Sequence, residues 1–227
     1  MPNSIGIEGD LTEGNMEILA QISNSLQEGD EGKVFELTRQ AIAAKLSPKR
    51  ILDEGLLAGM KVLGEKFGRH EIFLPDVLLG ARAMSIAMDQ IKPLLIDEHI
   101  PTMGKVVLGT VQGDLHDIGK NLVGIMLKGA GLEVIDLGKG VSPEKFVEAA
   151  LSEKADVLGM SALLTTTMPV MKQVIELLEQ RQLKETIRTI IGGAPVSQEY
   201  ANKIGADAYA YDAANAVVCV KRLLGLP

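Results

Sequence analysis

A histidine flanked by two aspartates occupies the segment 113–121, which reads Gly-Asp-Leu-His-Asp-Ile-Gly-Lys-Asn. His116 stands between Asp114 and Asp117 and is one of three histidines in the chain. A neutral imidazole nitrogen is a good ligand for borderline transition metals, and a carboxylate behind it fixes the tautomer of the ring. These residues therefore indicate a metal or cofactor ligand. Taken alone, they fit equally a solvated loop histidine beside a helix that Asp114 or Asp117 caps.

The surrounding pattern predicts that this segment is a loop between a strand and a helix. From residue 105 onward, short β-branched runs alternate with helical ones, which is typical of a parallel sheet covered on both faces. Ligands bind outside the carboxyl ends of such strands. We expect strands at Lys105–Thr110, Glu133–Asp136, Val157–Ser161, Thr189–Ile191 and Ala208–Ala210, and helices at Gly119–Gly129, Pro143–Lys154, Met168–Arg181, Ser197–Ile204 and Ala213–Leu224.

The first part of the chain has a different period. From Met16 to Ile96, apolar residues recur at three- and four-residue spacing, which predicts helices. Gly29-Asp30 separates the first two helices, and Ser47-Pro48 opens a third with serine as its N-cap. That helix runs to about Phe67, and a fourth extends from Asp76 to about Leu95 after Pro75. Four helices with short loops predict an antiparallel bundle.

Composition limits the classes of function. The net charge of -7 argues against a nucleic-acid partner, which would require a basic face. The single cysteine, Cys219, cannot form an internal disulfide and favours a reducing compartment. No apolar run is long enough to predict a membrane span, and the first 14 residues do not resemble a secretion signal. We therefore expect a cytoplasmic protein with no membrane partner.

Three other ligand sites fit the central motif poorly. A phosphate-binding P-loop has four residues between its glycines, whereas five separate Gly113 from Gly119, and Asn121 replaces the magnesium-binding hydroxyl. A dinucleotide site needs Gly-x-Gly-x-x-Gly, and Gly138-Lys139-Gly140 lacks the third glycine. A hydrolytic metal site needs further histidines or carboxylates, but the other two histidines lie in the helical half and the linker.

Two further strand ends carry residues suited to binding. The third strand ends in Ser-Ala-Leu-Leu-Thr-Thr-Thr, residues 161–167, and the fourth ends in Gly192-Gly193. Hydroxyls can bind a ligand, and paired glycines let one approach the backbone closely. Helix capping and a tight turn explain each feature singly. Their occurrence at the ends of three strands of one sheet favours a shared binding site.

These motifs together resemble the cobalamin-binding motif of B12-dependent methyltransferases and mutases, Asp-x-His-x-x-Gly, Ser-x-Leu and Gly-Gly. The matching residues are Asp114, His116, Gly119, Ser161, Leu163, Gly192 and Gly193. Between Gly119 and Ser161 lie 41 residues, and between Leu163 and Gly192 lie 28, as the family spacing implies. Residues 56–84 resemble the helical cap of methionine synthase. The chain is most similar to stand-alone corrinoid proteins of anaerobic methyltransferase systems.

Pattern and resemblance together predict an α/β chain. A four-helix bundle cap should precede a flavodoxin-like (Rossmann-type) domain with a five-stranded parallel sheet. We assign residues 1–14 to a flexible N-terminus, 15–98 to the cap, 99–104 to a mobile linker and 105–227 to the cobalamin-binding domain.

The resemblance implies roles for individual residues. His116 would be the lower cobalt ligand, Asp114 would accept from its second ring nitrogen, and Thr167 stands where the methionine synthase pattern has serine. Gly119, Gly192 and Gly193 would leave room for the nucleotide tail of the cofactor, which Ser161 and Thr165 would bind. The remaining expected contacts are Gly113, Leu115, Asp117 and Ile118 below the corrin, Tyr209, Asp212 and Ala213 near the tail, Phe67 and Leu74 from the cap, and Asp53 at the corrin edge.

The resemblance also implies a methyl carrier rather than a complete enzyme. Cobalt would take a methyl group from a methylamine, betaine, methanol or methoxylated aromatic held by a substrate:corrinoid methyltransferase. A corrinoid:acceptor methyltransferase would pass it to a coenzyme M-type thiol or tetrahydrofolate, and a reductive activation protein would be a third partner. The alternatives are a cobalamin-binding sensor, for which no DNA-reading basic helix is seen, and a mutase subunit, which would lack the preceding bundle.

Overall fold

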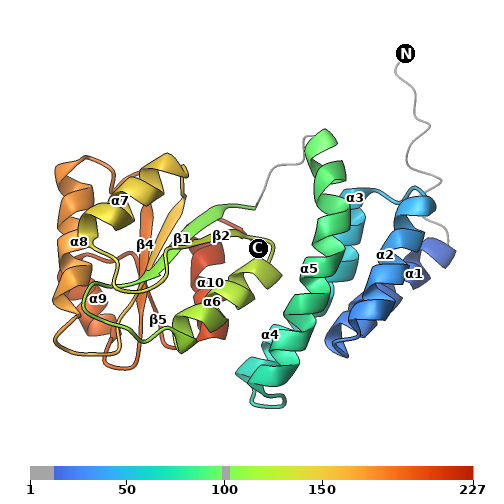
Figure 1. Cartoon of the computed structure of the whole chain (residues 1–227), viewed down its shortest axis with the longest axis horizontal. Coiled ribbons are helices and arrows are strands. Elements are labelled where there is room, and N and C mark those ends of the chain that lie inside the picture. Colours follow the sequence, from blue (N-terminus) through green and yellow to red (C-terminus); the bar gives the residue numbers. More distant parts are fainter. Residues whose placement is uncertain (1–12, 99–102, 227) are drawn as a thin grey trace. The chain divides into compact units, whose positions relative to one another are not determined.

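The computed structural model describes residues 13–98 and 103–226, which form two compact units. Figure 1 shows a helical unit and a unit built on a parallel sheet. The predicted fold class, helices followed by a five-stranded parallel α/β domain, is confirmed. Most of the expected flexible N-terminus and linker, residues 1–12 and 99–102, lies outside the described residues. In the described ranges, no helix is long and apolar enough to cross a membrane.

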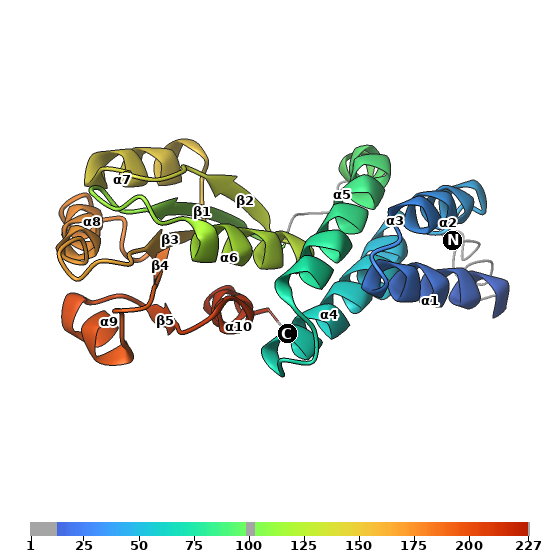
Figure 2. The same ribbon diagram turned by 60° about the horizontal axis from the view of Figure 1, so that its bottom comes forward.

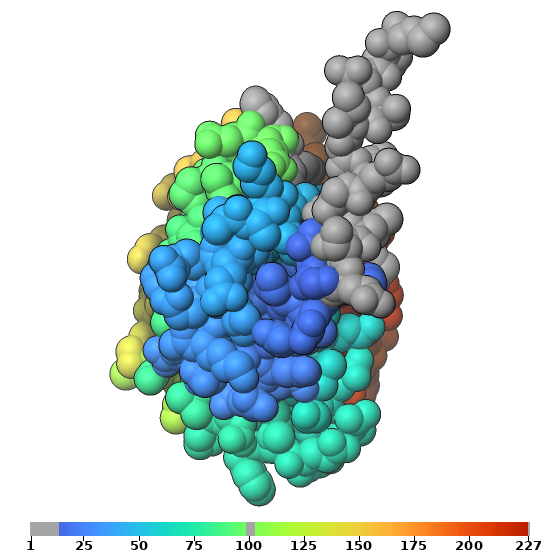
Figure 3. Space-filling model, turned by 90° about the vertical axis from the view of Figure 1, so that its right-hand side faces the viewer, coloured from blue at the N-terminus to red at the C-terminus, as the bar shows by residue number. Residues whose placement is uncertain are grey.

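The helical unit is held together by one apolar core. Its elements are α1 (Glu13–Gln27), α2 (Glu31–Ala43), α3 (Pro48–Arg50), the π-helical η1 (Ile51–Leu57), α4 (Ala58–Gly68) and α5 (Leu74–Asp97). The apolar residues at three- and four-residue spacing face inward, because helical periodicity places such residues on one side of a helix. The core includes Leu19, Ile22, Leu26, Val34, Leu56, Leu63 and Ile91. Figure 3 shows the surface that α1 and α2, in blue, present on this unit.

The predicted helix starts of this unit hold within two residues, but their local details differ. The hydroxyl of Ser47 does not cap α3, although Ser47 occupies the N-cap position and Pro48 follows it. The fourth helix begins at Leu74 rather than Asp76, because the backbone N–H of Phe73 donates to the Asp76 carboxylate at 2.8 Å. Pro75 is tolerated within the first turn, where a backbone N–H has no helical partner. The third helix is continuous from residue 48 to 68 but passes through η1, which periodicity did not reveal.

The second unit contains a five-stranded parallel sheet with the order β2-β1-β3-β4-β5. Its strands are β1 (Lys105–Thr110), β2 (Glu133–Asp136), β3 (Val157–Ser161), β4 (Arg188–Gly192) and β5 (Ala208–Ala210). The predicted strand bounds hold within one residue. In the register, Thr110 lies opposite Ser161 and Ser161 lies opposite Gly192. The three strand ends that carry the sequence motifs are therefore level at one edge.

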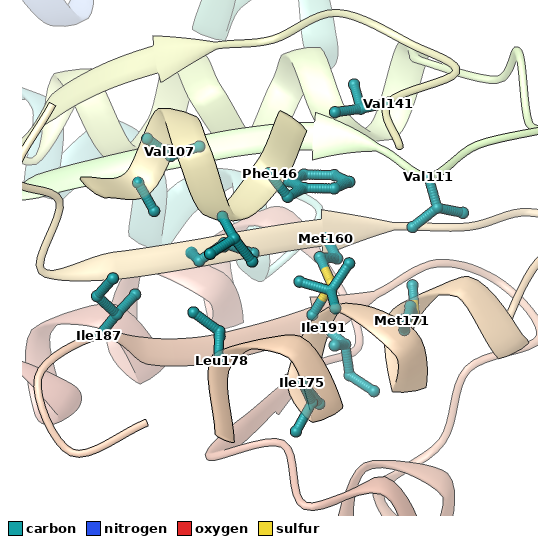
Figure 4. Packing of buried hydrophobic residues seen from close by; sticks show 14 of the residues in the cluster. Val107, Val111, Val141, Phe146, Met160, Met171, Ile175, Leu178, Ile187 and Ile191 are labelled. Atoms are coloured by element: carbon teal, nitrogen blue, oxygen red, sulfur yellow. The ribbon is translucent and has the colours of Figure 1, made fainter. Parts of the chain in front are cut away.

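Helices cover both faces of this sheet, as Figure 2 shows. The helices are α6 (Ile118–Gly129), α7 (Pro143–Ser152), α8 (Pro169–Gln180), α9 (Gln198–Ile204) and α10 (Ala213–Leu223), and each predicted bound holds within two residues. Alternating strand residues serve the two faces. Val107 packs with α7, α8 and α9, whereas Val106 and Leu108 pack with α6 and α10. Figure 4 shows the first of these cores around Phe146 and Met160.

Candidate functional site

The loops after β1 and β3 meet at the carboxyl-terminal edge of the sheet through one carboxylate. Asp114 is fully buried in the loop after β1. Its Oδ2 accepts hydrogen bonds from the backbone N–H groups of Leu163 at 2.7 Å and Leu164 at 3.1 Å. Both donors lie in the loop after β3. The structure thus brings together two of the three predicted motifs, and β4, which carries the third, is the next strand in the sheet.

The same carboxylate holds His116. Asp114 Oδ1 lies 2.7 Å from His116 Nδ1 and accepts the backbone N–H of His116 at 3.1 Å. Burial opposes ionisation of Asp114, but hydrogen bonds from Leu163, His116 and Thr167 outweigh it and hold the pKa of that carboxyl well below its usual range. Because the carboxylate is ionised and only accepts, Nδ1 carries the ring proton. The lone pair of the imidazole is then at Nε2, as a metal ligand requires.

Thr167 completes this arrangement with a hydroxyl. Its Oγ1 lies 2.8 Å from Asp114 Oδ2 and 2.8 Å from the carbonyl oxygen of Leu164. The hydroxyl has one proton, and the ionised carboxylate is the stronger acceptor. A relay from His116 through Asp114 to Thr167 is therefore present, with threonine at the position where serine is usual in the motif it resembles.

Neither aspartate of the motif caps the following helix. Asp117 occupies the N-cap position of α6, but its side chain makes no capping hydrogen bond. Its Oδ2 lies 3.6 Å from Lys139 Nζ instead. Both carboxylate oxygens of Asp114 accept hydrogen bonds from the loops after β1 and β3 instead. The expectation that Asp114 or Asp117 caps this helix is therefore wrong, because Asp114 is buried and accepts from five donors in the two loops and the His116 ring.

Exposed apolar side chains flank His116 in the sequence and also occur in the loop after β3. The His116 side chain is 51% exposed. The exposed apolar residues are Leu115 in the loop after β1, Ile118 at the start of α6, and Leu163 and Leu164 in the loop after β3. Large apolar groups gathered in solvent mark a binding surface. A half-exposed imidazole, together with exposed apolar side chains in the segments that the Asp114 carboxylate joins, fits a broad, largely apolar ligand with a metal at its centre.

The three glycines of the motif differ in what surrounds them. A Cβ at Gly119 would meet nothing within 4 Å. At Gly193, where φ is +124°, a Cβ would lie 1.8 Å from the carbonyl oxygen of Ala162, and at Gly192 it would lie 3.0 Å from that of Ala210. The packing of the protein backbone itself thus requires glycine at 193 and leaves little room for a side chain at 192. Of the three, Gly119 faces open space that a ligand could fill.

The other expected tail contacts lie at the same edge. The hydroxyls of Ser161 and Thr165 make no hydrogen bond within the described ranges, so both can bind a ligand. Tyr209 is half-buried at the end of the sheet, and Ala213 is buried. Asp212 caps α10 by accepting the backbone N–H of Asn215 at 2.7 Å. Capping is thus a sufficient structural reason for Asp212.

Phe67, Leu74 and Asp53 belong to the helical unit. Phe67 and Leu74 are half-buried, and Asp53 is exposed and paired with Lys49. Their contacts with a cofactor remain predictions. The structure also reveals Lys120, a buried lysine that the sequence did not single out. Its Nζ lies 2.6 Å from both carboxylate oxygens of Asp136, at the end of β2. A lysine in the first turn of a helix carries no sequence signal for burial.

Comparison with known proteins identifies the two units separately. A family model described as a B12 binding domain matches residues 104–219, and a second model of the same description matches residues 18–92. The chain is similar to trimethylamine corrinoid protein 2 of Methanosarcina mazei, with 41% identity over 93% of this chain and 98% of that protein. It is 44% identical to dimethylamine corrinoid protein 1 of Methanosarcina acetivorans over 85% of this chain and 94% of that protein.

Two solved structures agree with these matches. One is the methanol:cobalamin methyltransferase complex MtaBC from Methanosarcina barkeri, with a TM-score of 0.82 and 33% identity over 92% of this chain and 80% of that chain. The other is a cobalamin-binding protein from Desulfitobacterium hafniense, with a TM-score of 0.74 and 30% identity over 91% of this chain and 98% of that chain.

Proposed function

Because this chain belongs to the B12-binding family and binds a corrinoid, we propose that it is the methyl-carrying component of a methyltransferase system. The observation that carries the proposal is the His116 ring, which is held at Nδ1 by a buried, ionised Asp114 and is half-exposed. The two corrinoid proteins compared above are named for trimethylamine and dimethylamine. We therefore propose a methylamine as the methyl donor, with betaine, methanol and methoxylated aromatics as the other candidates.

The residues of the α/β unit would hold the corrinoid from below. When bound, it supplies a cobalt centre able to accept and release a methyl group. His116 would provide the lower ligand through Nε2, and Asp114 would fix the ring and make it a stronger donor. Thr167 would keep Asp114 ionised and in place. Leu115 and Ile118 would cover apolar parts of the lower face, and Gly119 would leave space for the nucleotide tail.

The partners would be two methyltransferases. A substrate:corrinoid methyltransferase would deliver the methyl group, and a corrinoid:acceptor methyltransferase would transfer it to a thiol of the coenzyme M type or to tetrahydrofolate. The similarity to the protein in the MtaBC complex supports the first of these. A reductive activation protein would restore oxidised cofactor. In the helical unit, residues 15–98, Phe67 and Leu74 would shield the upper face.

The ligand assignment is tested by spectroscopy on reconstituted protein. Cobalamin bound to the wild-type chain and reduced to cobalt(II) should give an electron paramagnetic resonance signal split by a histidine nitrogen. His116→Ala should lose that splitting, whereas His70→Ala, an exposed histidine of the helical unit, should keep it. Persistence of the splitting in His116→Ala would refute the assignment.

The carrier role needs a separate assay. A panel of methyl donors should be tested with candidate substrate:corrinoid methyltransferases and the reconstituted protein. The absorbance of the methylated cofactor reports the transfer. We expect a methylamine to methylate the wild-type protein. The His116→Ala variant should be methylated more slowly than the wild type. Failure of every donor in the panel to methylate the protein would contradict the proposed role.

A further inference from the structure

His116 is held by a second buried side chain, which lies outside the relay through Asp114. Thr110 ends β1 and is completely buried. Its Oγ1 donates a hydrogen bond to the backbone carbonyl oxygen of His116 at 2.9 Å. We propose that Thr110 is a positioning residue, whose hydroxyl sets the backbone of His116 so that the ring is in place before the corrinoid binds. This inference rests on the proposed role of His116 as a ligand.

The hydroxyl of Thr110 is a fixed point because the sheet holds its backbone on both sides. The N–H of Thr110 donates to the carbonyl of Gly138 at 2.9 Å, and its carbonyl accepts the N–H of Val141 at 2.9 Å. On its other side, Thr110 is in register with Ser161 on β3. A β-branched residue also has few χ1 rotamers. In the described part of the chain, the carbonyl of His116 is the one partner of this hydroxyl.

Together, Thr110 and Asp114 bind three groups of one residue. Asp114 Oδ1 accepts the backbone N–H and faces the ring nitrogen, while Thr110 holds the carbonyl. Asp114 holds the N–H and the ring of His116, and the hydrogen bond from Thr110 holds its carbonyl as well. Ordering a residue before the ligand arrives lowers the conformational cost of binding.

Two variants isolate the hydroxyl. Thr110→Val replaces it with a methyl of similar size, and Thr110→Ser keeps it while removing the methyl. One neutral hydrogen bond corresponds to roughly a 2- to 10-fold change in an equilibrium constant. We expect Thr110→Val to weaken cobalamin binding by about that factor and to lower the fraction of cobalt(II) signal split by a histidine nitrogen. Thr110→Ser should behave as the wild type in both measurements.

A role in positioning His116 is separated from a general structural role by repeating the comparison in a His116→Ala background. There, Thr110→Val should leave cobalamin affinity unchanged, because no ring remains to be positioned. An equal loss of affinity in both backgrounds would overturn the inference, as would wild-type affinity and splitting in Thr110→Val. Thr110→Ala provides a second hydroxyl-free variant if Thr110→Val does not fold. If His116→Ala itself keeps the nitrogen splitting, the proposed ligand fails and the inference fails with it.

Discussion

Gly119→Ala separates what the cofactor requires from what the fold requires. Gly119 lies in the first turn of α6, and the space its Cβ would fill is empty. If the nucleotide tail of the corrinoid enters there, the added methyl group meets the ligand and nothing else. The variant should therefore fold normally and bind cobalamin poorly.

The two effects have opposite signs. Replacing a helical glycine with alanine stabilises a protein by about 0.5–1 kcal/mol, because alanine loses less backbone entropy. Forcing one methyl group into a filled, close-packed site costs about 1–3 kcal/mol. The second figure corresponds to a loss of cobalamin affinity of about 5- to 150-fold. Stability should thus rise slightly while affinity falls.

Gly124→Ala in the same helix is the matched control. A Cβ at Gly124 would lie 3.4 Å from Leu108 Cδ2, an ordinary contact on the side of α6 that faces the sheet. Thermal unfolding without cofactor and titration with cobalamin should be run on both variants. Gly124→Ala should match the wild type in affinity. Wild-type affinity in Gly119→Ala would refute the reasoning that the tail occupies this space.

Three further outcomes follow from the carboxylate and ammonium groups of the site. Thr167→Val removes a donor from ionised Asp114 and should cost about 1.5–3 kcal/mol in urea unfolding, while Thr167→Ser should cost much less; equal stabilities of the two variants would contradict the relay. The folded-state pKa of Asp114 lies below its unfolded value of about 3.9, so its stabilisation is complete above that pH and is lost as pH falls toward the folded pKa. The stability advantage of the wild type over Asp114→Asn should therefore shrink below about pH 4, and a constant difference from pH 7 to pH 3 would count against this. Asp136→Ala leaves the ammonium of Lys120, whose side chain is 1% exposed, without its main partner and should cost about 3–5 kcal/mol. Lys120→Met leaves Asp136, whose side chain is 43% exposed, accessible to water, so chemical unfolding should show a smaller loss; the reverse order would show that burial of Lys120 does not set the cost.

The fold and the central motif could be predicted from sequence because their signals are local. Alternation of β-branched and helical runs gives a parallel sheet, and three short motifs mark three adjacent strand ends. The pairing of His116 with Asp114, which the resemblance implies, is present at 2.7 Å.

What could not be predicted depends on contacts between distant segments. Gly193 was expected to make room for a ligand, but its need for glycine comes from the carbonyl of Ala162, 31 positions earlier in the numbering. The burial of Lys120 depends on Asp136, which β2 places 2.6 Å from its ammonium group. The spacing of apolar residues from Ile51 to Leu57 also suits an α-helix, so it does not predict the π-helical stretch found there. The first two of these features are decided by tertiary packing, which overrides local preference.

The donors to Asp114 Oδ2 have a consequence for anyone who wishes to move this site into another protein. They come from residues 49, 50 and 53 positions away in the chain. A graft of the loop 113–121 onto a different parallel sheet would carry the histidine but leave a carboxylate short of its donors. Such a carboxylate would take up a proton or turn toward solvent, and the ring would lose its orientation. The smallest transplantable unit is therefore two loops on two paired strands, not a nine-residue motif.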